Sequence, residues 1–273
     1  MKLLSIDIGI KNLSICLFDV NNNDYKILDW DILNLTELTP KVCQCGKPAK
    51  YKIRDNYYCN KHSKQTNFIN PDNIIGLNKI KKYSLEKLTN FHNDYINTDI
   101  TLNKNQLMSS IETFFENNVF SLIEKINASK IDLITLGRNL QIMFDSKEVF
   151  NNIDRVIIEN QIGPIANRMK TIQGMVVQYF IIKNNKIEIN LVSSSNKLKL
   201  TEEIIETIDI KNELKKEKLT YAERKQEGIK KCIFYLINQD TKWSNLFNLY
   251  SKKDDLSDCF LQGIWFIKNK MQN

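Results

Sequence analysis

KLLSIDIGIKNLSICLFDV, residues 2–20, contains two apolar runs that are separated by a short turn. Residues 2–8 are almost continuously apolar, which is typical of a buried strand, and Gly9 ends this run. Residues 13–20 alternate well enough to predict a second strand. Because the connection between the two is short, we expect them to pair as antiparallel neighbours in one sheet.

Further predicted elements extend this strand pair into a larger sheet. An asparagine-rich turn at residues 21–24 leads into a third strand, 25–33, which completes an antiparallel meander. Later in the chain, helices are predicted at 130–147, 163–184, 220–237 and 255–270, and strands at 156–160 and 186–193. A meander followed by β-α units predicts an α/β fold in which helices flank a mixed five-stranded sheet.

The middle of the chain lacks this regular alternation, and we interpret residues 39–127 as an insertion. The main domain is then predicted to consist of residues 1–38 and 128–273. A small hairpin that carries cysteines is predicted at 41–65, and amphipathic helical pieces are predicted near 84–96 and 109–126.

The composition is that of a folded, basic protein. The 273 residues are 42% hydrophobic and 26% charged, which is typical of a globular chain and excludes a disordered one. The chain has 39 Lys and Arg against 32 Asp and Glu, a net charge of +7. This excess favours polyanionic partners such as DNA, RNA or a membrane surface, although many basic proteins bind none of these.

The N-terminus and the cysteine pattern predict an intracellular protein with no membrane partner. Asp7 interrupts the first apolar run and no small-residue cleavage site follows, so no signal peptide is expected. No apolar stretch approaches the roughly 20 residues that span a bilayer. Cys16, Cys232 and Cys259 lie singly in apolar runs, which argues against a disulfide framework.

Two acidic residues lie at the ends of predicted strands. Asp7 follows an apolar run, and Glu159 ends the apolar segment VIIE shortly before Gly163 and Pro164 open a helix. A carboxylate in such a place is costly unless it is paired, and a divalent cation is a strong candidate partner. The alternatives are an edge or turn-capping role for Asp7 and a simple helix-flanking role for Glu159.

Two more acidic residues begin the final predicted helix. Asp255 and Asp258 are three residues apart, so both point to one helical face, and Cys259 and Phe260 indicate a helix that packs on the core. Acids in a first turn are commonly partners of the helix dipole, and Asp254 is expected to have that role or to be solvated. Asp255 and Asp258 would repel each other, and a bound cation would relieve the repulsion.

A separate cluster of cysteines and histidine lies in the insertion. The spacing C-x-C, thirteen residues, C-x-x-H provides a Cys₃His set suited to tetrahedral Zn²⁺: Cys43, Cys45, Cys59 and His62. The alternative is a group of adventitious thiols. Residues 41–65 also hold seven Lys and Arg against one Asp, interleaved with tyrosines, as in nucleic-acid contact surfaces.

Four segments together resemble a known family: IDIGIKNLSICLFD, IIENQIG, YAERKQEGIKK and KKDDLSD. They are similar to motifs of the RNase H-like superfamily, and within it of the RuvC-type Holliday junction resolvases of poxviruses and other large DNA viruses, which are related to fungal mitochondrial resolvases. The resemblance covers residues 1–35 and about 130–270, and it does not include the zinc-binding insertion. It implies that Asp7, Glu159, Asp255 and Asp258 are catalytic, metal-binding carboxylates.

The resemblance implies a homodimeric endodeoxyribonuclease that cuts branched DNA during recombination, replication or repair. Two Mg²⁺ ions per active site, with Mn²⁺ as a substitute, would flank the scissile phosphodiester, and Zn²⁺ would be structural. If the protein is viral, the host cytoplasm or a viral replication site is the expected location. The alternatives are another RNase H-like nuclease, acting on RNA–DNA hybrid or branched DNA, and a non-catalytic zinc-containing DNA-binding protein.

Basic residues near these segments are predicted to contact the nucleic acid, although solvated lysines and arginines are an alternative throughout. They lie in the hairpin, after Glu159, in the YxxRK pattern and beside the final acids: Lys50, Lys52, Arg54, Arg168, Arg224, Lys225 and Lys253.

Overall fold

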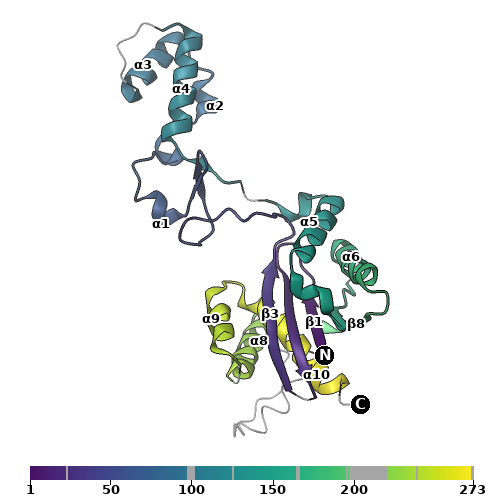
Figure 1. Ribbon diagram of the computed structural model, residues 1–273. Coiled ribbons are helices and arrows are strands. Elements are labelled where there is room, and N and C mark those ends of the chain that lie inside the picture. Colours follow the sequence, from purple (N-terminus) through teal and green to yellow (C-terminus); the bar gives the residue numbers. More distant parts are fainter. Residues whose placement is uncertain are drawn as a thin grey trace. The chain divides into compact units, whose positions relative to one another are not determined.

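The computed structural model divides into two compact units, and each is considered on its own (Figure 1). The first unit comprises Met1–Leu38 and Asn127–Asn273, and the second comprises Thr39–Ile126. The structure describes residues 1–22, 24–96, 102–124, 126–163, 167–194, 196, 220–237 and 239–271.

The first unit contains the mixed five-stranded sheet that the sequence predicts. Its strands are β1 (Lys2–Asp7), β2 (Leu13–Asn21), β3 (Asp24–Leu33), β7 (Arg155–Glu159) and β8 (Glu188–Val192), in the order β3-β2-β1-β7-β8. The first three form an antiparallel meander, and β1, β7 and β8 run parallel to one another. The fold is therefore α/β, with β1 at the centre of the sheet.

Side chains alternate between the two faces of this sheet, and each face has its own core. Leu4 and Ile6 of β1 belong to the core formed with α5 (Leu133–Asp145) and α6 (Asn167–Lys183). Leu3 belongs to the opposite core, which is formed with α8 (Tyr221–Leu236), α9 (Thr241–Leu249) and α10 (Lys253–Lys270). Figure 1 shows these two groups of helices on opposite sides of the strands.

In the described part of the first unit, the helices lie where the sequence predicts them, except for α9. Two short 3₁₀ helices, Ala128–Lys130 and Glu148–Asn152, flank α5. No element is predicted between residues 237 and 255, yet α9 lies there, with Asp240 as its N-cap. Only Trp243 and Phe247 of its nine residues are buried. Two apolar positions do not establish a helical period, so the sequence does not predict this helix.

The second unit combines a small sheet with a group of helices. The sheet has the order β5-β4-β6, with β4 (Tyr51–Ile53) and β5 (Asn56–Tyr58) forming the predicted hairpin and β6 (Ser121–Leu122) adding a third strand. The helices are α1 (Asn60–Ser63), α2 (Leu77–Ile80), α3 (Leu85–Tyr95) and α4 (Lys104–Asn118), with a 3₁₀ turn at Pro71–Asn73. The predicted helix at 109–126 ends early, because the chain leaves α4 to enter β6.

None of the helices in the described ranges is both long enough and apolar enough to cross a membrane.

Candidate active site

Asp7 and Glu159 end adjacent parallel strands at the same edge of the sheet. The register of β1 and β7 pairs Ile6 with Ile158, so the next residue of each strand is one of the two acids. Parallel strands lie about 4.8 Å apart, which places the two acids side by side. By alternation, Asp7 shares a face with Ser5, and Glu159 shares a face with Ile157, which is the face that α10 covers.

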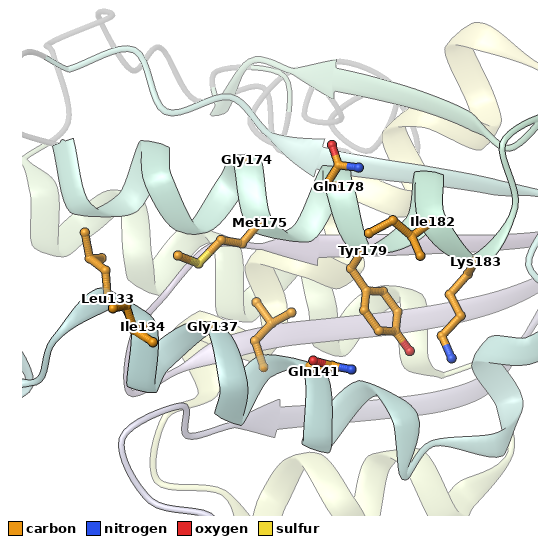
Figure 2. Close-up of a pocket in the computed structure, with 11 residues that line it drawn as sticks. Leu133, Ile134, Gly137, Gln141, Gly174, Met175, Gln178, Tyr179, Ile182 and Lys183 are labelled. Carbon is orange, nitrogen blue, oxygen red and sulfur yellow. The ribbon is translucent and has the colours of Figure 1, made fainter.

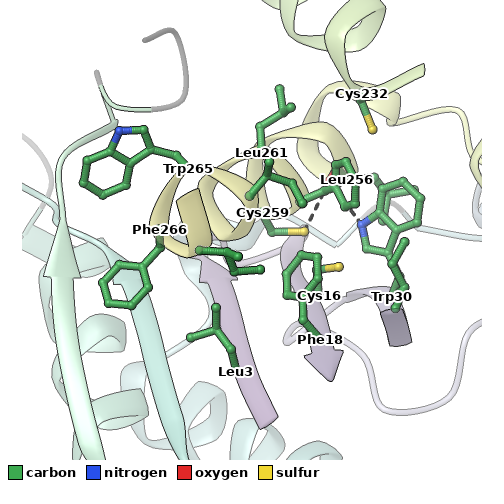
Figure 3. Close-up of a cluster of buried hydrophobic side chains, with 14 of the residues drawn as sticks. Leu3, Cys16, Phe18, Trp30, Cys232, Leu256, Cys259, Leu261, Trp265 and Phe266 are labelled. Atoms are coloured by element: carbon green, nitrogen blue, oxygen red, sulfur yellow. Dashed lines mark hydrogen bonds between the residues drawn. The ribbon is translucent and has the colours of Figure 1, made fainter. Parts of the chain in front are cut away.

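The start of α10 is held against this edge by hydrogen bonds from three strands. Ser14 Oγ donates to the Asp255 carbonyl at 2.7 Å, and Ser14 is the register partner of Asp7 in β2. Trp30 Nε1 donates to the Leu256 carbonyl at 3.1 Å, as Figure 3 shows, and Ser5 Oγ donates to the Cys259 carbonyl at 2.6 Å. The backbone of Asp255 is therefore anchored beside the strand pair that carries Asp7.

One stripe of α10 faces β1. Gln262 Nε2 donates to Ser5 Oγ and to the Ile6 carbonyl, each at 3.1 Å. Asp258 and Asp255 precede Gln262 by about one and two helical turns, so their side chains lie on the same stripe. The stripe leads towards the edge at which Asp7 and Glu159 lie, and all four acids are half-buried.

Asp255 carries a carboxylate oxygen that lacks a hydrogen-bond partner within the described part of the chain, and this Oδ2 atom is buried. Burial raises the pKa of its carboxyl group above the ordinary value, and the charges of Asp254 and Asp258 raise it further. Asp254 differs: although burial opposes the change, a hydrogen bond and ion pair with Lys225 lower the pKa of Asp254.

These acids fit a divalent cation by the chemistry of their donors. Hard cations such as Mg²⁺ prefer carboxylate oxygens and keep several waters, and a cation would satisfy the buried Asp255 oxygen. The four carboxylates are not gathered as tightly as the ligands of the second unit. In the ranges that the structure describes, only Cys43, Cys45, Cys59 and His62 form a group of three or more such ligands with all ligand atoms within 4.8 Å.

The Cys₃His group lies around the β4–β5 hairpin of the second unit. Cys43 Sγ is 3.2 Å from His62 Nδ1, and Cys45 Sγ is 3.9 Å from Cys59 Sγ. Gly46 has a φ of 77° and donates its backbone N–H to the Cys43 carbonyl at 2.8 Å, which forms a tight turn after the first two cysteines. The structure thus brings together the four ligands that the spacing predicts.

Backbone amides favour the thiolate form of two of these cysteines. Hydrogen bonds from the backbone of Cys45 and of Cys59 lower the pKa of the Cys43 thiol to about 7. A hydrogen bond from the backbone of His62 lowers the pKa of Cys59 in the same way. Because the thiolate is the form that binds a metal, this environment suits a metal site.

The basic residues of the hairpin lie beside aromatic rings. Lys50 Nζ is 4.9 Å from the centre of the Tyr51 ring, and Lys52 Nζ is 5.8 Å from that of Tyr57. Arg54 occupies the hairpin turn with a φ of 50°, and its guanidinium donates to Asn117 Oδ1 at 2.7 Å. Lys50 and Arg54 are exposed, and Lys52 is half-exposed.

The predicted basic residues of the first unit have different environments. Arg168 donates to the backbone carbonyls of Ala128 and Ile131, so it ties α6 to the segment before α5. Arg224 is exposed, and Lys225 pairs with Asp254. Lys253 Nζ donates to Asn248 Oδ1 at 3.1 Å and lies over the Phe247 ring. Four further lysines precede Tyr221 and lie outside the described residues: Lys211, Lys215, Lys216 and Lys218.

The sequence reasoning missed the side chains that anchor α10, which are Ser5, Ser14, Trp30 and Gln262. A signal for the first of them exists in the sequence, because Ser5 precedes Asp7 by two residues and so shares its face of a strand. A small polar residue inside an otherwise apolar run needs a hydrogen-bond partner. The identity of that partner follows only from the packing of a helix about 250 residues away in sequence.

An apolar groove of about 600 Å³ lies between α5 and α6, on the opposite side of the sheet from the acids. Figure 2 shows Leu133 and Ile134 of α5 along one wall, with Met175, Tyr179 and Ile182 of α6 along the other. Ile134 is 67% exposed and Ile182 is 74% exposed. Such a concentration of exposed aliphatic side chains is typical of a surface that another protein covers.

The fold and the acids define an α/β protein with a candidate metal-binding edge. No family model matches the chain. An uncharacterized protein of Acanthamoeba polyphaga mimivirus is 28% identical, in an alignment that covers 98% of this chain and 75% of the relative.

The solved structures that the chain is similar to include one viral protein and one fungal protein. The fowlpox virus resolvase in complex with its Holliday junction DNA substrate has a TM-score of 0.46 and 14% identity, over 98% of this chain and 97% of the other. The yeast mitochondrial Holliday junction resolvase has a TM-score of 0.47 and 17% identity, over 99% and 80%. These are the kinds of resolvase that the sequence motifs resemble.

Proposed function

We propose that this protein is a metal-dependent endonuclease that cuts branched DNA, with the four-way junction as its substrate. The observation that carries the proposal is the convergence of acids from β1, β7 and α10, with a buried Asp255 oxygen that lacks a partner in the described structure. A buried carboxylate oxygen without a hydrogen-bond partner destabilises a fold, and a bound cation would remove that cost at Asp255. The net charge of +7 favours a polyanionic substrate.

In this mechanism each acid has a distinct role. Two divalent cations, when bound, activate a water for in-line attack on the phosphodiester and stabilise the leaving 3′ oxygen. Asp7, on the central strand, would help to hold both cations, Glu159 would hold one of them, and the pair Asp255 and Asp258 would hold the other. The attack forms a new P–O bond and breaks the P–O3′ bond, which leaves a 5′-phosphate and a 3′-hydroxyl.

Basic side chains near the start of α10 would bind the DNA backbone. Lys225 lies there through its ion pair with Asp254, and Arg224 precedes it on the exposed side of α8. Lys253 opens α10 itself. Arg168 already donates to two backbone carbonyls through its Nη2 atom. A contact with DNA would use its other N–H groups or replace these bonds.

The second unit would hold a structural Zn²⁺ and provide a further DNA contact. Cys43, Cys45, Cys59 and His62 match the Cys₃His set that Zn²⁺ binds in closed structural sites. Lys50, Lys52 and Arg54 lie on the same hairpin, two of them beside tyrosine rings. Lysine charges next to exposed aromatic faces suit both the phosphates and the bases of a nucleic acid.

A second copy of this chain would cover the groove between α5 and α6. Cutting two opposed strands of a junction requires two active sites, and a twofold dimer supplies them. The groove is apolar, and Ile134 and Ile182 on its rim are largely exposed in one chain. A symmetric interface over this face would remove both side chains from water.

The proposal is tested by incubating the full chain with Mg²⁺ and a labelled four-way junction, beside linear duplex and RNA–DNA hybrid. We expect paired symmetric nicks near the branch point, with Mn²⁺ also supporting cleavage. Asp7→Asn should abolish the nicks. Asp19→Asn is the matched control, because Asp19 is an exposed acid that lies opposite Lys2 at the other end of the same strand pair and forms an ion pair with the N-terminal amine of Met1.

Each other result points to a different function. Cutting of the hybrid alone would replace junction resolution by another RNase H-like activity. Binding of the junction without any cutting, and unaffected by Asp7→Asn, would indicate a non-catalytic zinc-containing DNA-binding protein.

A further inference from the structure

The first turn of α10 carries Asp255 but lacks the usual means of fixing a helix start. Its N-cap is Lys252, which makes no side-chain capping hydrogen bond, and the first helical bond, from Leu256 N to the Lys252 carbonyl, is 3.5 Å long. By contrast, α4 and α8 both begin with complete capping boxes. Asp254 and Asp255 also repel each other within this turn.

Hydrogen bonds from the sheet hold this turn by its carbonyl groups, whereas a cap would accept from its free N–H groups. Ser14, which is fully buried, donates to the Asp255 carbonyl, and Trp30 donates to the carbonyl of the next residue, Leu256. Side-chain bonds to two successive carbonyls restrict both the rotation of the helix and its position along its axis. They do so at the turn from which the Asp255 side chain projects.

Ser14 also connects the two sets of acids. It lies opposite Asp7 in the register of β1 and β2, and its hydroxyl donates a hydrogen bond to the backbone carbonyl of Asp255. The backbones of Asp7 and Asp255 are therefore connected through Ser14 alone, which is paired with Asp7 in the sheet and donates to the Asp255 carbonyl at 2.7 Å. A shift of α10 along or around its axis would change the separation of these carboxylates first.

We infer that Ser14, supported by Trp30, is a positioning residue that sets the distance between the Asp7 and Asp255 carboxylates and thereby the affinity of the edge for divalent cations. This inference rests on the proposed function. Groups that orient metal ligands commonly contribute 10-fold to 100-fold to metal affinity without touching the metal. Neither side chain needs to contact DNA in order to act.

The test measures binding of Mn²⁺ by calorimetry in the absence of DNA, so that it does not depend on turnover. Wild type and Asp7→Asn define the binding that belongs to this edge. For Ser14→Ala we expect the dissociation constant of that binding to rise about 10-fold, by loss of ligand orientation. The Mg²⁺ concentration for half-maximal junction cleavage should rise by a similar factor.

Ser5→Ala is the matched control. Ser5 is equally buried and also donates to a carbonyl of α10, but that carbonyl belongs to Cys259, one turn farther from Asp255. We expect Ser5→Ala to lower thermal stability at least as much as Ser14→Ala and to change Mn²⁺ affinity by less than twofold. If Ser14→Ala does not fold, Trp30→Phe removes the donor to Leu256 while it keeps a ring against Phe247, and it should weaken Mn²⁺ binding in the same direction.

The outcomes separate the inference from the proposed function. Mn²⁺ binding in wild type that Asp7→Asn removes, together with equal binding by Ser14→Ala or, in its place, Trp30→Phe, overturns the inference alone. Equal weakening by Ser14→Ala and Ser5→Ala overturns it too, because a general loss of packing then explains both. Absence of any Mn²⁺ binding sensitive to Asp7→Asn overturns the metal-dependent function and the inference together.

Discussion

At the scale of single residues, Asp254 and Asp255 show how neighbours in sequence acquire opposite electrostatic environments. Asp254 forms an ion pair with Lys225 of α8, whereas a buried oxygen of Asp255 has no hydrogen-bond partner in the described structure. The pKa of Asp254 is lowered and that of Asp255 is raised. The folded state therefore favours the charged form of the first and the neutral form of the second.

These directions predict that Asp255→Asn stabilises the metal-free protein near neutral pH. A raised carboxyl pKa means that the charge opposes folding at pH values above the ordinary carboxyl pKa, so removing the charge should raise the free energy of unfolding, by an amount that solvent screening keeps small. The gain should disappear as the pH falls below about 4, where the unfolded-state carboxyl is protonated as well. Thermal unfolding without divalent cations measures it.

Asp254→Asn is the matched comparison and has the opposite expected sign. A lowered carboxyl pKa contributes stability above the ordinary pKa that is lost as the pH falls through the folded-state value. Asp254→Asn should therefore destabilise the protein near neutral pH, and the difference from wild type should shrink in acid. Equal effects of the two substitutions would contradict this account.

At the scale of elements, α10 is the helix on which the candidate site depends. It packs so closely on β2 that a Cβ atom at Gly263 would lie 2.2 Å from Cε2 of Phe18. Phe18 belongs to the core on this face of the sheet, and Figure 3 shows it beneath α10. The absence of a side chain at Gly263 lets the helix approach the strand.

Gly263→Ala is therefore expected to destabilise the first unit by about 1–3 kcal/mol, because the helix or the Phe18 ring must move. Gly228→Ala in α8 is the control, since its Cβ would be 4.0 Å from the nearest atom, on Leu261, which is ordinary contact. Alanine there should be neutral or stabilising by up to about 1 kcal/mol through helix propensity. Urea unfolding measures both, and a neutral Gly263→Ala would refute the packing argument.

At the scale of the whole molecule, the two compact units have separate cores. The second unit has small hydrophobic clusters, one around Ile80, Leu88 and Ile111 and one around Tyr51, Ile53 and Phe120. Small units with small cores often depend on a metal for stability. A Zn²⁺ ion held by the Cys₃His group would link the hairpin to α1.

Removal of Zn²⁺ by a chelator, or Cys59→Ser, is expected to unfold the hairpin and leave the five-stranded sheet folded. Hydrogen exchange should show loss of protection at Tyr51–Tyr58 and retained protection in β1 and β7. Lys61→Ser, an exposed change beside the ligands, should leave zinc content and protection unaltered. Retained protection of the hairpin after zinc loss would argue against a structural role for the metal.

The proposed dimer leads to a prediction about a single exposed side chain. Ile182→Lys in the groove between α5 and α6 should convert a dimer to monomers in sedimentation velocity, because burying a lysine there is costly. Ile237→Lys at the C-cap of α8 is the matched control, since Ile237 is 72% exposed and lies outside the groove. A wild-type monomer, or a dimer that survives Ile182→Lys and dissociates with Ile237→Lys, would assign the interface elsewhere.

Local sequence alone determined the strands of the five-stranded sheet, most of the longer helices and the Cys₃His set. Apolar runs and alternation define β1, β2, β3, β7 and β8 because burial on a sheet face demands them, and the C-x-C and C-x-x-H spacing brings its four ligands together over a short span. The short helix α9 was not predicted, because two buried aromatic residues in nine do not establish a helical period.

Only the tertiary structure decided how the acids relate to one another. Asp7, Glu159 and Asp255 are separated by about 100 residues or more, and no local rule states that β7 pairs beside β1 or that Ser14 binds the Asp255 carbonyl. The difference between Asp254 and Asp255 has the same origin, because it depends on Lys225 of another helix. Local pattern specifies which residues are buried, whereas long-range packing specifies their neighbours, and the candidate site is made of such neighbours.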